Sequence, residues 1–81
     1  MKRECVEELI NSNREIEFTY KGNRFSITYY NDNRKNYISV CKFYEKPIDV
    51  SSAKELLKLK YGKYTLEKIF AIIPDSAIDI Y

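Results

Sequence analysis

The strongest constraint on the fold is an alternating pattern on both sides of Lys21-Gly22-Asn23. Large apolar side chains occupy every second position there, at Ile16, Phe18, Tyr20, Phe25, Ile27 and Tyr29. A period of two is typical of half-buried strands, and Gly22-Asn23 suits a two-residue hairpin loop. That loop predicts the pairs Tyr20–Phe25, Phe18–Ile27 and Ile16–Tyr29. The sequence therefore predicts a β-hairpin over residues 15–30, with its apolar residues on one face.

A third strand is predicted over residues 37–44, after a polar turn at residues 31–36. Pairing Tyr29 with Ile38 keeps the aliphatic residues of both strands on the core side. Lys42 then falls on the core side, which predicts a bulge or an early strand end there. Pro47 cannot donate to a sheet ladder and is expected to end the sheet.

One helix is predicted before these strands in the sequence, and another after them. Residues 2–12 carry an apolar stripe of helical spacing, made of Cys5, Val6, Leu9 and Ile10. Ser52 and Glu55 have the spacing of a capping box, which predicts a helix over residues 53–61. Gly62 supplies the stop signal for that helix.

The last part of the chain predicts a further helix and an extended tail. Thr65 is placed to cap a helix over residues 66–73, and Pro74 ends it. Beyond it, Ile78 and Ile80 alternate weakly. The tail therefore fits either a short strand on a sheet edge or an extended segment docked on the core.

Together these elements predict one α+β domain over residues 1–81, of order α-β-β-β-α-α. Its three-stranded antiparallel meander has helices packed on one face, with a short C-terminal strand as the alternative for the tail. No apolar run approaches the ~20 residues of a membrane span, and no signal-peptide core follows the first residues, so a cytoplasmic protein is expected. Cys5 and Cys41 are expected to be reduced and partly buried, without metal-ligand spacing.

The outer face of the predicted sheet, opposite the helices, is unusually aromatic for an uncovered face. Strand parity places Tyr30, Tyr37 and Phe43 on it. Such a face could hold a protein partner or stack nucleic-acid bases. Alternatively, these residues serve as good strand formers and bury against neighbouring side chains or the C-terminal segment.

Basic and aromatic residues are interleaved in two clusters, although the net charge is only +2. The clusters consist of Arg34, Lys35 and Tyr37, and of Lys58, Lys60, Tyr61, Lys63 and Tyr64. Surfaces for single-stranded nucleic acids combine cations for phosphates with rings for bases. Helical lysines can equally form a solvated face whose aliphatic stems cover apolar surface.

The sequence lacks the usual catalytic groups. It contains no histidine, so either cysteine would lack its customary base as a nucleophile. The two glycines are both accounted for by turns, and no glycine-rich phosphate loop exists. We therefore expect a protein that is not an enzyme and that uses neither a cofactor nor a metal.

Three runs, residues 16–34, 66–70 and 74–81, resemble small uncharacterised proteins of prophages and conjugative elements in low-GC Gram-positive bacteria. The resemblance covers most of the chain but brings no known activity, so no functional residues are carried over from it. It implies a mobile-element context, in which small non-catalytic proteins often act by stoichiometric binding.

These observations favour a non-catalytic domain that binds a protein partner through Tyr30, Tyr37 and Phe43, as a regulator, adaptor or inhibitor. The alternative function is nucleic-acid binding through the two basic-aromatic clusters. In a third hypothesis, the outer face is the contact of a homodimer.

Overall fold

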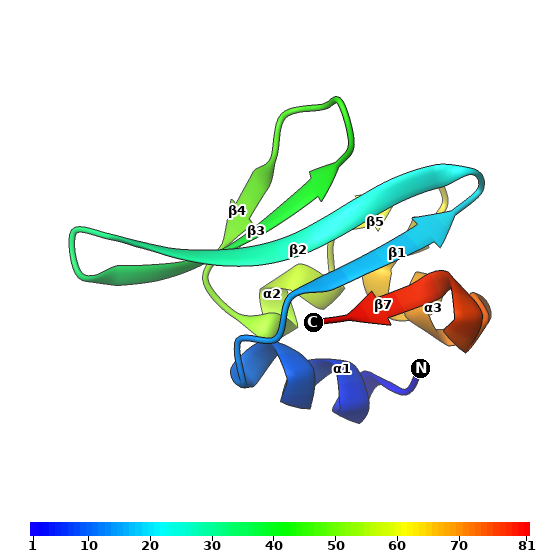
Figure 1. Cartoon of the computed structure of the whole chain (residues 1–81), viewed down its shortest axis with the longest axis horizontal. Coiled ribbons are helices and arrows are strands. Elements are labelled where there is room, and N and C mark those ends of the chain that lie inside the picture. Colours follow the sequence, from blue (N-terminus) through cyan, green and yellow to red (C-terminus); the bar gives the residue numbers. More distant parts are fainter.

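The computed structural model describes residues 1–81 as a small α+β domain, as the sequence predicts. Figure 1 shows the helices gathered on one side of a twisted antiparallel sheet. The sheet has five strands in the order β4-β3-β2-β1-β7, two more than predicted, and β5 and β6 form a separate pair. The elements are α1 (Arg3–Asn11), β1 (Ile16–Tyr20), β2 (Asn23–Asp32), β3 (Lys35–Lys42), β4 (Ile48–Val50), α2 (Ala53–Leu57), β5 (Lys60–Tyr61), β6 (Tyr64–Thr65), α3 (Leu66–Ile72), the 3₁₀ helix η1 (Asp75–Ala77) and β7 (Ile78–Ile80).

The predicted hairpin forms, but the predicted register between β1 and β2 is wrong by two residues. Phe18 pairs with Phe25, and the two-residue loop is Lys21-Gly22. Both loop residues have positive φ, 49° and 75°, as a type I′ turn requires. A shift of two residues preserves side-chain parity, so the apolar residues still share one face.

The register between β2 and β3 is confirmed, with Tyr29 paired to Ile38. Their two-residue turn places Asn33 and Arg34 at φ values of 50° and 67°. β3 ends at Lys42, so the early strand end is the correct alternative and Phe43 lies in the following loop. Pro47 does not end the sheet, because β4 begins one residue later and pairs with β3.

The core lies between the sheet and the helices and contains 16 buried residues, all apolar or aromatic. Phe18 lies at its centre, with its ring 4.9 Å from that of Phe25 and 4.7 Å from that of Phe70. On α1, Val6 and Ile10 are buried, whereas Cys5 is exposed rather than partly buried as expected. Cys5 lines a surface hollow together with Met1, Leu9 and Ile80.

The helix predicted over residues 53–61 is wrong in length, because α2 ends at Leu57. Lys60 and Tyr61 instead form β5 and pair with β6 around Gly62, whose φ is 70°. This hairpin brings the Tyr61 ring 4.8 Å from the Phe25 ring, edge-on. Burial of Tyr61 against the core therefore outweighs the helical pattern of its neighbours.

The predicted N-caps are confirmed. Ser52 Oγ accepts a hydrogen bond from the Glu55 N–H at 3.1 Å, and Thr65 Oγ1 accepts one from the Lys68 N–H at 3.3 Å. The Glu55 carboxylate accepts a hydrogen bond from the Ser51 N–H, at 2.9 Å, one residue before the cap. This bond and a second one from the Ser51 hydroxyl lower the pKa of Glu55.

The tail forms the edge strand β7, which is one of its two predicted alternatives. Ile78 pairs with Phe18 and Ile80 with Ile16 in an antiparallel ladder to β1. The Tyr81 N–H continues the ladder by donating to the Glu15 carbonyl at 2.8 Å.

None of the helices has the length and apolar character that a membrane crossing requires.

Candidate binding surface

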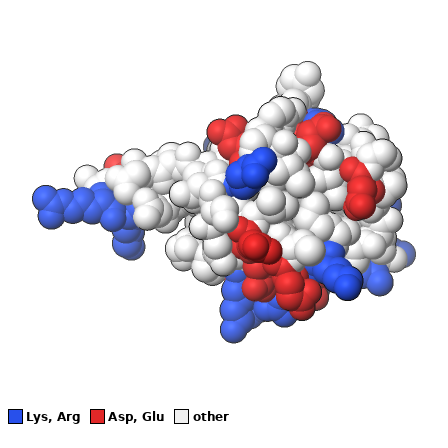
Figure 2. All heavy atoms as spheres, turned by 60° about the horizontal axis from the view of Figure 1, so that its bottom comes forward, with Lys and Arg blue, Asp and Glu red and all other residues white.

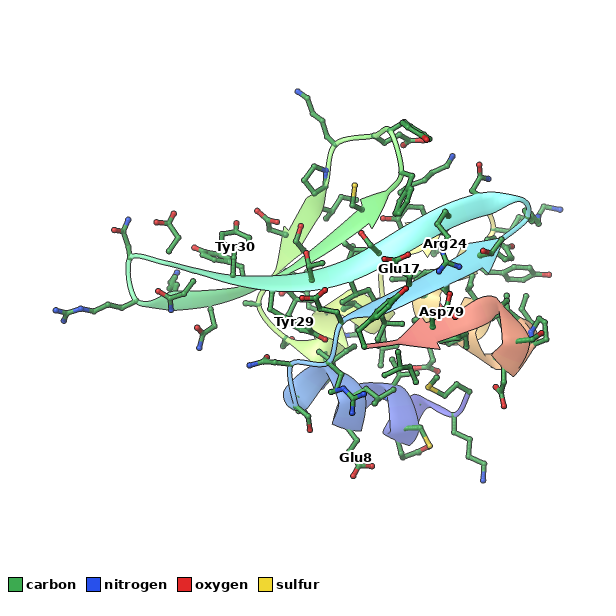
Figure 3. All side chains as sticks on the ribbon, viewed as in Figure 1. Glu8, Glu17, Arg24, Tyr29, Tyr30 and Asp79 are labelled. Carbon is green, nitrogen blue, oxygen red and sulfur yellow. The ribbon has the colours of Figure 1, made fainter.

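The outer face of the sheet, on the side away from the helices, carries a stacked pair of tyrosines. Tyr30 of β2 and Tyr37 of β3 are paired across the strands, with ring centroids 5.1 Å apart and planes 22° apart. Figure 3 shows Tyr30 and its neighbour Tyr29 on opposite sides of β2, as strand parity requires. Tyr30 remains 43% exposed, so the stacked pair leaves an accessible aromatic surface.

A carboxylate from β4 fixes the stacked pair. The Tyr30 hydroxyl donates to Asp49 Oδ2 at 2.6 Å, which links β2 to β4 across β3. This hydrogen bond and the nearby negative charge raise the pKa of Tyr30 to about 12. Sequence reasoning missed Asp49, because a three-residue strand directly after a proline leaves no periodic signal.

The third predicted residue, Phe43, lies apart from the stacked pair. It is six positions beyond Tyr37, a separation of about 20 Å along an extended strand. Phe43 is 39% exposed and its ring meets that of the fully exposed Tyr44 edge-on. The outer face is therefore aromatic at two ends and carries small side chains between them: Ser26, Thr28, Ser39 and Cys41.

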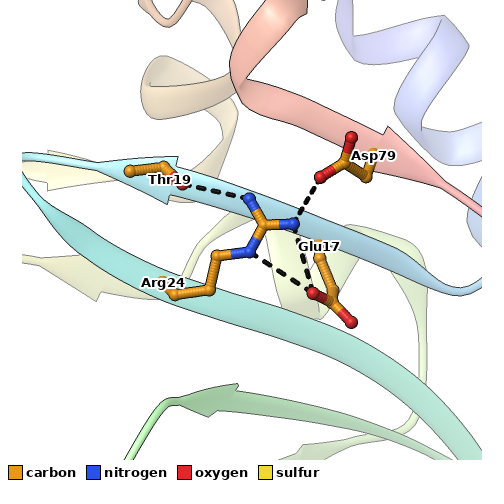
Figure 4. Close-up of polar contacts among 4 residues, drawn as sticks. All are labelled: Glu17, Thr19, Arg24 and Asp79. Atoms are coloured by element: carbon orange, nitrogen blue, oxygen red, sulfur yellow. Dashed lines mark hydrogen bonds and ion pairs between the residues drawn. The ribbon is translucent and has the colours of Figure 1, made fainter.

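An ionic cluster occupies the β7 side of the same face (Figure 4). The Arg24 guanidinium donates to Glu17 Oε1 at 3.1 Å and to Thr19 Oγ1 at 3.0 Å, and forms a close ion pair with Asp79. These bonds, that to Asp79 above all, raise the pKa of Arg24. The cluster joins β2, β1 and β7 side by side. Both carboxylates of the cluster, those of Glu17 and Asp79, are paired with Arg24, so we assign the cluster a structural role in joining the strands.

The two predicted basic-aromatic clusters do not form one surface. Arg34 and Lys35 lie at the end of the β2–β3 hairpin, which projects from the body as a tip with basic side chains (Figure 2). The segment carrying Lys58, Lys60, Lys63 and Tyr64 lies toward the other end of the long axis, around β5 (Figure 1). Tyr61 of this second cluster is partly buried, and this burial raises its pKa. Its ring packs on Phe25 and is not available for base stacking.

Removing the Tyr30 hydroxyl should change how stability depends on pH. Because the folded-state pKa is raised to about 12 from an ordinary value of 10, unfolded chains lose the proton first as pH rises. The Tyr30 contribution is thus fully present below pH 10 and is lost between about pH 10 and pH 12. The variant Tyr30→Phe should show a shallower fall in stability over that interval than the parent chain, measured as urea midpoints at successive pH values.

The control for this measurement is Tyr44→Phe, because the Tyr44 ring is fully exposed and packs only against Phe43. An identical pH dependence for Tyr30→Phe and the parent chain would contradict the role assigned to the Tyr30–Asp49 bond.

The outer face is thus a partly exposed surface with an ordered tyrosine pair at one end, a second aromatic pair in the β3–β4 loop and an ionic cluster along β7. The chain was compared with protein-family models, with curated proteins and with solved structures, and no match was found in any of the three comparisons.

Proposed function

We propose that this chain is a non-catalytic domain that binds a protein partner through the outer face of its sheet. The stacked Tyr30–Tyr37 pair is the observation that carries the proposal. Aromatic side chains supply much of the binding energy at protein interfaces, since they bury a large area with few rotatable bonds. In this domain Tyr30 is exposed and Tyr37 is partly buried, on a face that no helix covers.

The tyrosine pair is also ordered before any partner binds. Each ring packs on the other, and the Asp49 carboxylate holds the Tyr30 hydroxyl. Binding to a fixed ring loses less conformational entropy than binding to a mobile one, so preorganisation raises affinity. Phe43 and Tyr44 would provide a second contact at the other end of the face. The small side chains between them leave room for a partner to approach the sheet.

A role as regulator, adaptor or inhibitor in a mobile element is the biological context that the sequence resemblance suggests. Proteins of this size that lack catalytic groups commonly act at a one-to-one ratio with a target. A cytoplasmic location is part of the same proposal.

The test is a pull-down from a bacterial lysate with the tagged chain, with and without nuclease, followed by titration of any protein retained. The double variant Tyr37→Ala/Phe43→Ala should bind that protein about 30-fold more weakly, as expected for the loss of an aromatic anchor worth about 2 kcal/mol. The matched control is Tyr64→Ala. Tyr64 is 38% exposed, nearly the same as Phe43, but lies on β6 outside this sheet.

Three outcomes would contradict the proposal. Equal affinity of the folded double variant and the parent chain would exclude the outer face. Recovery that collapses after nuclease treatment, with binding that weakens steeply between ~50 and ~200 mM salt, would favour the alternative function in nucleic-acid binding. A doubled mass in light scattering that the double variant reverses would make the outer face a homodimer contact.

A further inference from the structure

The β2–β3 hairpin extends well past its neighbours in the sheet. β1 pairs with β2 only as far as Ile27, and β4 pairs with β3 only as far back as Ile38. Residues 28–37 therefore form a two-stranded projection, which we call the arm and which is seen at the left of Figure 1. The arm has a strand edge on each side that no other strand of the sheet covers.

The register defines which backbone groups face the open edge of β2 in the arm. Hydrogen-bonded and non-hydrogen-bonded pairs alternate along an antiparallel ladder, and the pair next to a two-residue turn is hydrogen-bonded. The Phe43 N–H donates to the Arg24 carbonyl at 2.9 Å, which confirms this phase. Tyr29 and Asn31 therefore belong to non-hydrogen-bonded pairs. Their N–H and C=O groups point away from β3, toward the side on which β1 would continue.

The chain that precedes β1 does not use these groups. It turns away at Asn13, whose φ is 55°, and the Arg14 N–H donates to the Leu9 carbonyl of α1 at 3.0 Å. The only hydrogen bond between this segment and Tyr29 involves the Tyr29 side chain. Its hydroxyl donates to the Arg14 carbonyl at 2.7 Å. The open edge of β2 thus offers two donors and two acceptors in the spacing of a strand.

A groove of about 430 Å³ lies beside the base of the arm. It is lined by side chains that carry amide or hydroxyl groups and by a few apolar ones, from the end of α1, the two arm strands and the start of α2. None of the lining residues is charged: Ile10, Asn11, Asn13, Tyr29, Tyr30, Asn36, Tyr37, Ile38, Ser51, Ser52 and Ala53. A charged ligand group would lose water there without gaining an opposite charge, so the lining selects uncharged polar and apolar groups.

From these two observations we infer that the open edge of β2 in the arm accepts an extended, uncharged peptide segment of the protein partner. The segment adds to the sheet as a strand, with backbone hydrogen bonds to Tyr29 and Asn31 and alternate side chains in the groove. This inference rests on the proposed protein-binding function and specifies the chemistry of the partner. Tyr30 and Tyr37 also border this groove, although their rings stack on the outer face.

A matched pair of variants at Asn31 tests whether this edge is used. Asn31 directs its N–H outward, away from β3. Proline removes that N–H without breaking the β2–β3 ladder, and alanine keeps it, so both variants should fold. Each variant also loses the same side-chain bond, from Asn31 Nδ2 to Asn36 Oδ1 at 2.8 Å, so Asn31→Pro and Asn31→Ala differ in the backbone donor at the open edge.

The probe is a phage-displayed library of random 12-residue peptides, panned on the immobilised full chain. Enriched peptides are then synthesised and titrated by fluorescence anisotropy. We expect the enriched peptides to be uncharged, to bind Asn31→Pro at least tenfold more weakly than the parent chain, and to bind Asn31→Ala within twofold of it. A tenfold loss corresponds to about one backbone hydrogen bond. In the parent chain, peptide binding should slow hydrogen exchange of the Tyr29 and Asn31 amides, a readout that needs no variant.

The inference is overturned if no peptide is enriched over an unrelated control protein, if enriched peptides bind Asn31→Pro as well as the parent chain, or if the Tyr29 and Asn31 amides exchange unchanged. A doubled mass in light scattering that Asn31→Pro returns to a single chain would assign the edge to a second copy instead. Undiminished binding of the captured protein partner to Asn31→Pro, with loss in Tyr37→Ala/Phe43→Ala, would leave the proposed function standing and remove only this inference.

Discussion

Replacing Phe18 with alanine should lower the free energy of unfolding by about 3–5 kcal/mol, the range for large-to-small changes of a buried phenylalanine. Phe18 is fully buried on β1, and its ring lies between those of Phe25 and Phe70, so it joins the sheet to α3. Alanine would remove both aromatic contacts and leave a cavity at the centre of the core. Because domains of this size are typically stable by only about 5–15 kcal/mol, much of the margin would be lost.

Urea denaturation followed by far-ultraviolet circular dichroism measures this effect. Phe43→Ala is the control, because the same substitution at a 39% exposed position in a loop should change stability by no more than about 0.5 kcal/mol. Equal losses in the two variants would show that the Phe18 ring is not the centre of the core.

Removing β7, by ending the chain at Ala77, should cost about 2–4 kcal/mol. The deletion removes the antiparallel ladder between Glu15–Phe18 and residues 78–81, in which each net hydrogen bond is worth about 1 kcal/mol. It also removes Ile78, which packs against the core, and the ion pair between Asp79 and Arg24. β1 would become an exposed edge strand, a common site of self-association.

Two measurements check the deletion: urea midpoints for stability, and light scattering at increasing concentration for self-association. Asp79→Ala is the control, because it keeps the strand and removes only a surface ion pair, at a cost of no more than about 1 kcal/mol. If the shortened chain is as stable as the parent and stays monomeric, the pairing of β7 with β1 contributes nothing and the assignment fails.

The sequence predicted what depends on contacts close together in the chain. The alternation at Phe18, Phe25 and Ile27 defines the core face of β1 and β2, because side-chain direction repeats every two residues in any strand. The same parity places Tyr30 and Tyr37 together on the outer face. The caps at Ser52 and Thr65 also follow from local chemistry, since each hydroxyl needs only a backbone N–H three residues ahead.

The hairpin loop shows where a local pattern was insufficient. Lys21-Gly22 and Gly22-Asn23 are both acceptable two-residue turns, and both leave the apolar residues on the same face. The structure uses Lys21-Gly22, which places Phe18 opposite Phe25 and stacks their rings. Parity cannot distinguish registers that differ by two residues, so contacts between strands decide.

Long-range contacts also decided the elements that the sequence misjudged. Tyr61 ends up in β5, beside Phe25, although its neighbours have helical spacing. The three-residue strands β4 and β7 are too short to show a period, and each exists because a longer strand offers it an open edge. Local patterns in the sequence thus predict the central hairpins, their core face and the helix caps, since these need only neighbouring residues. The tertiary structure alone decided the sheet edges, the link from Asp49 to Tyr30 and the open edge of the arm, because each depends on where distant segments stop pairing.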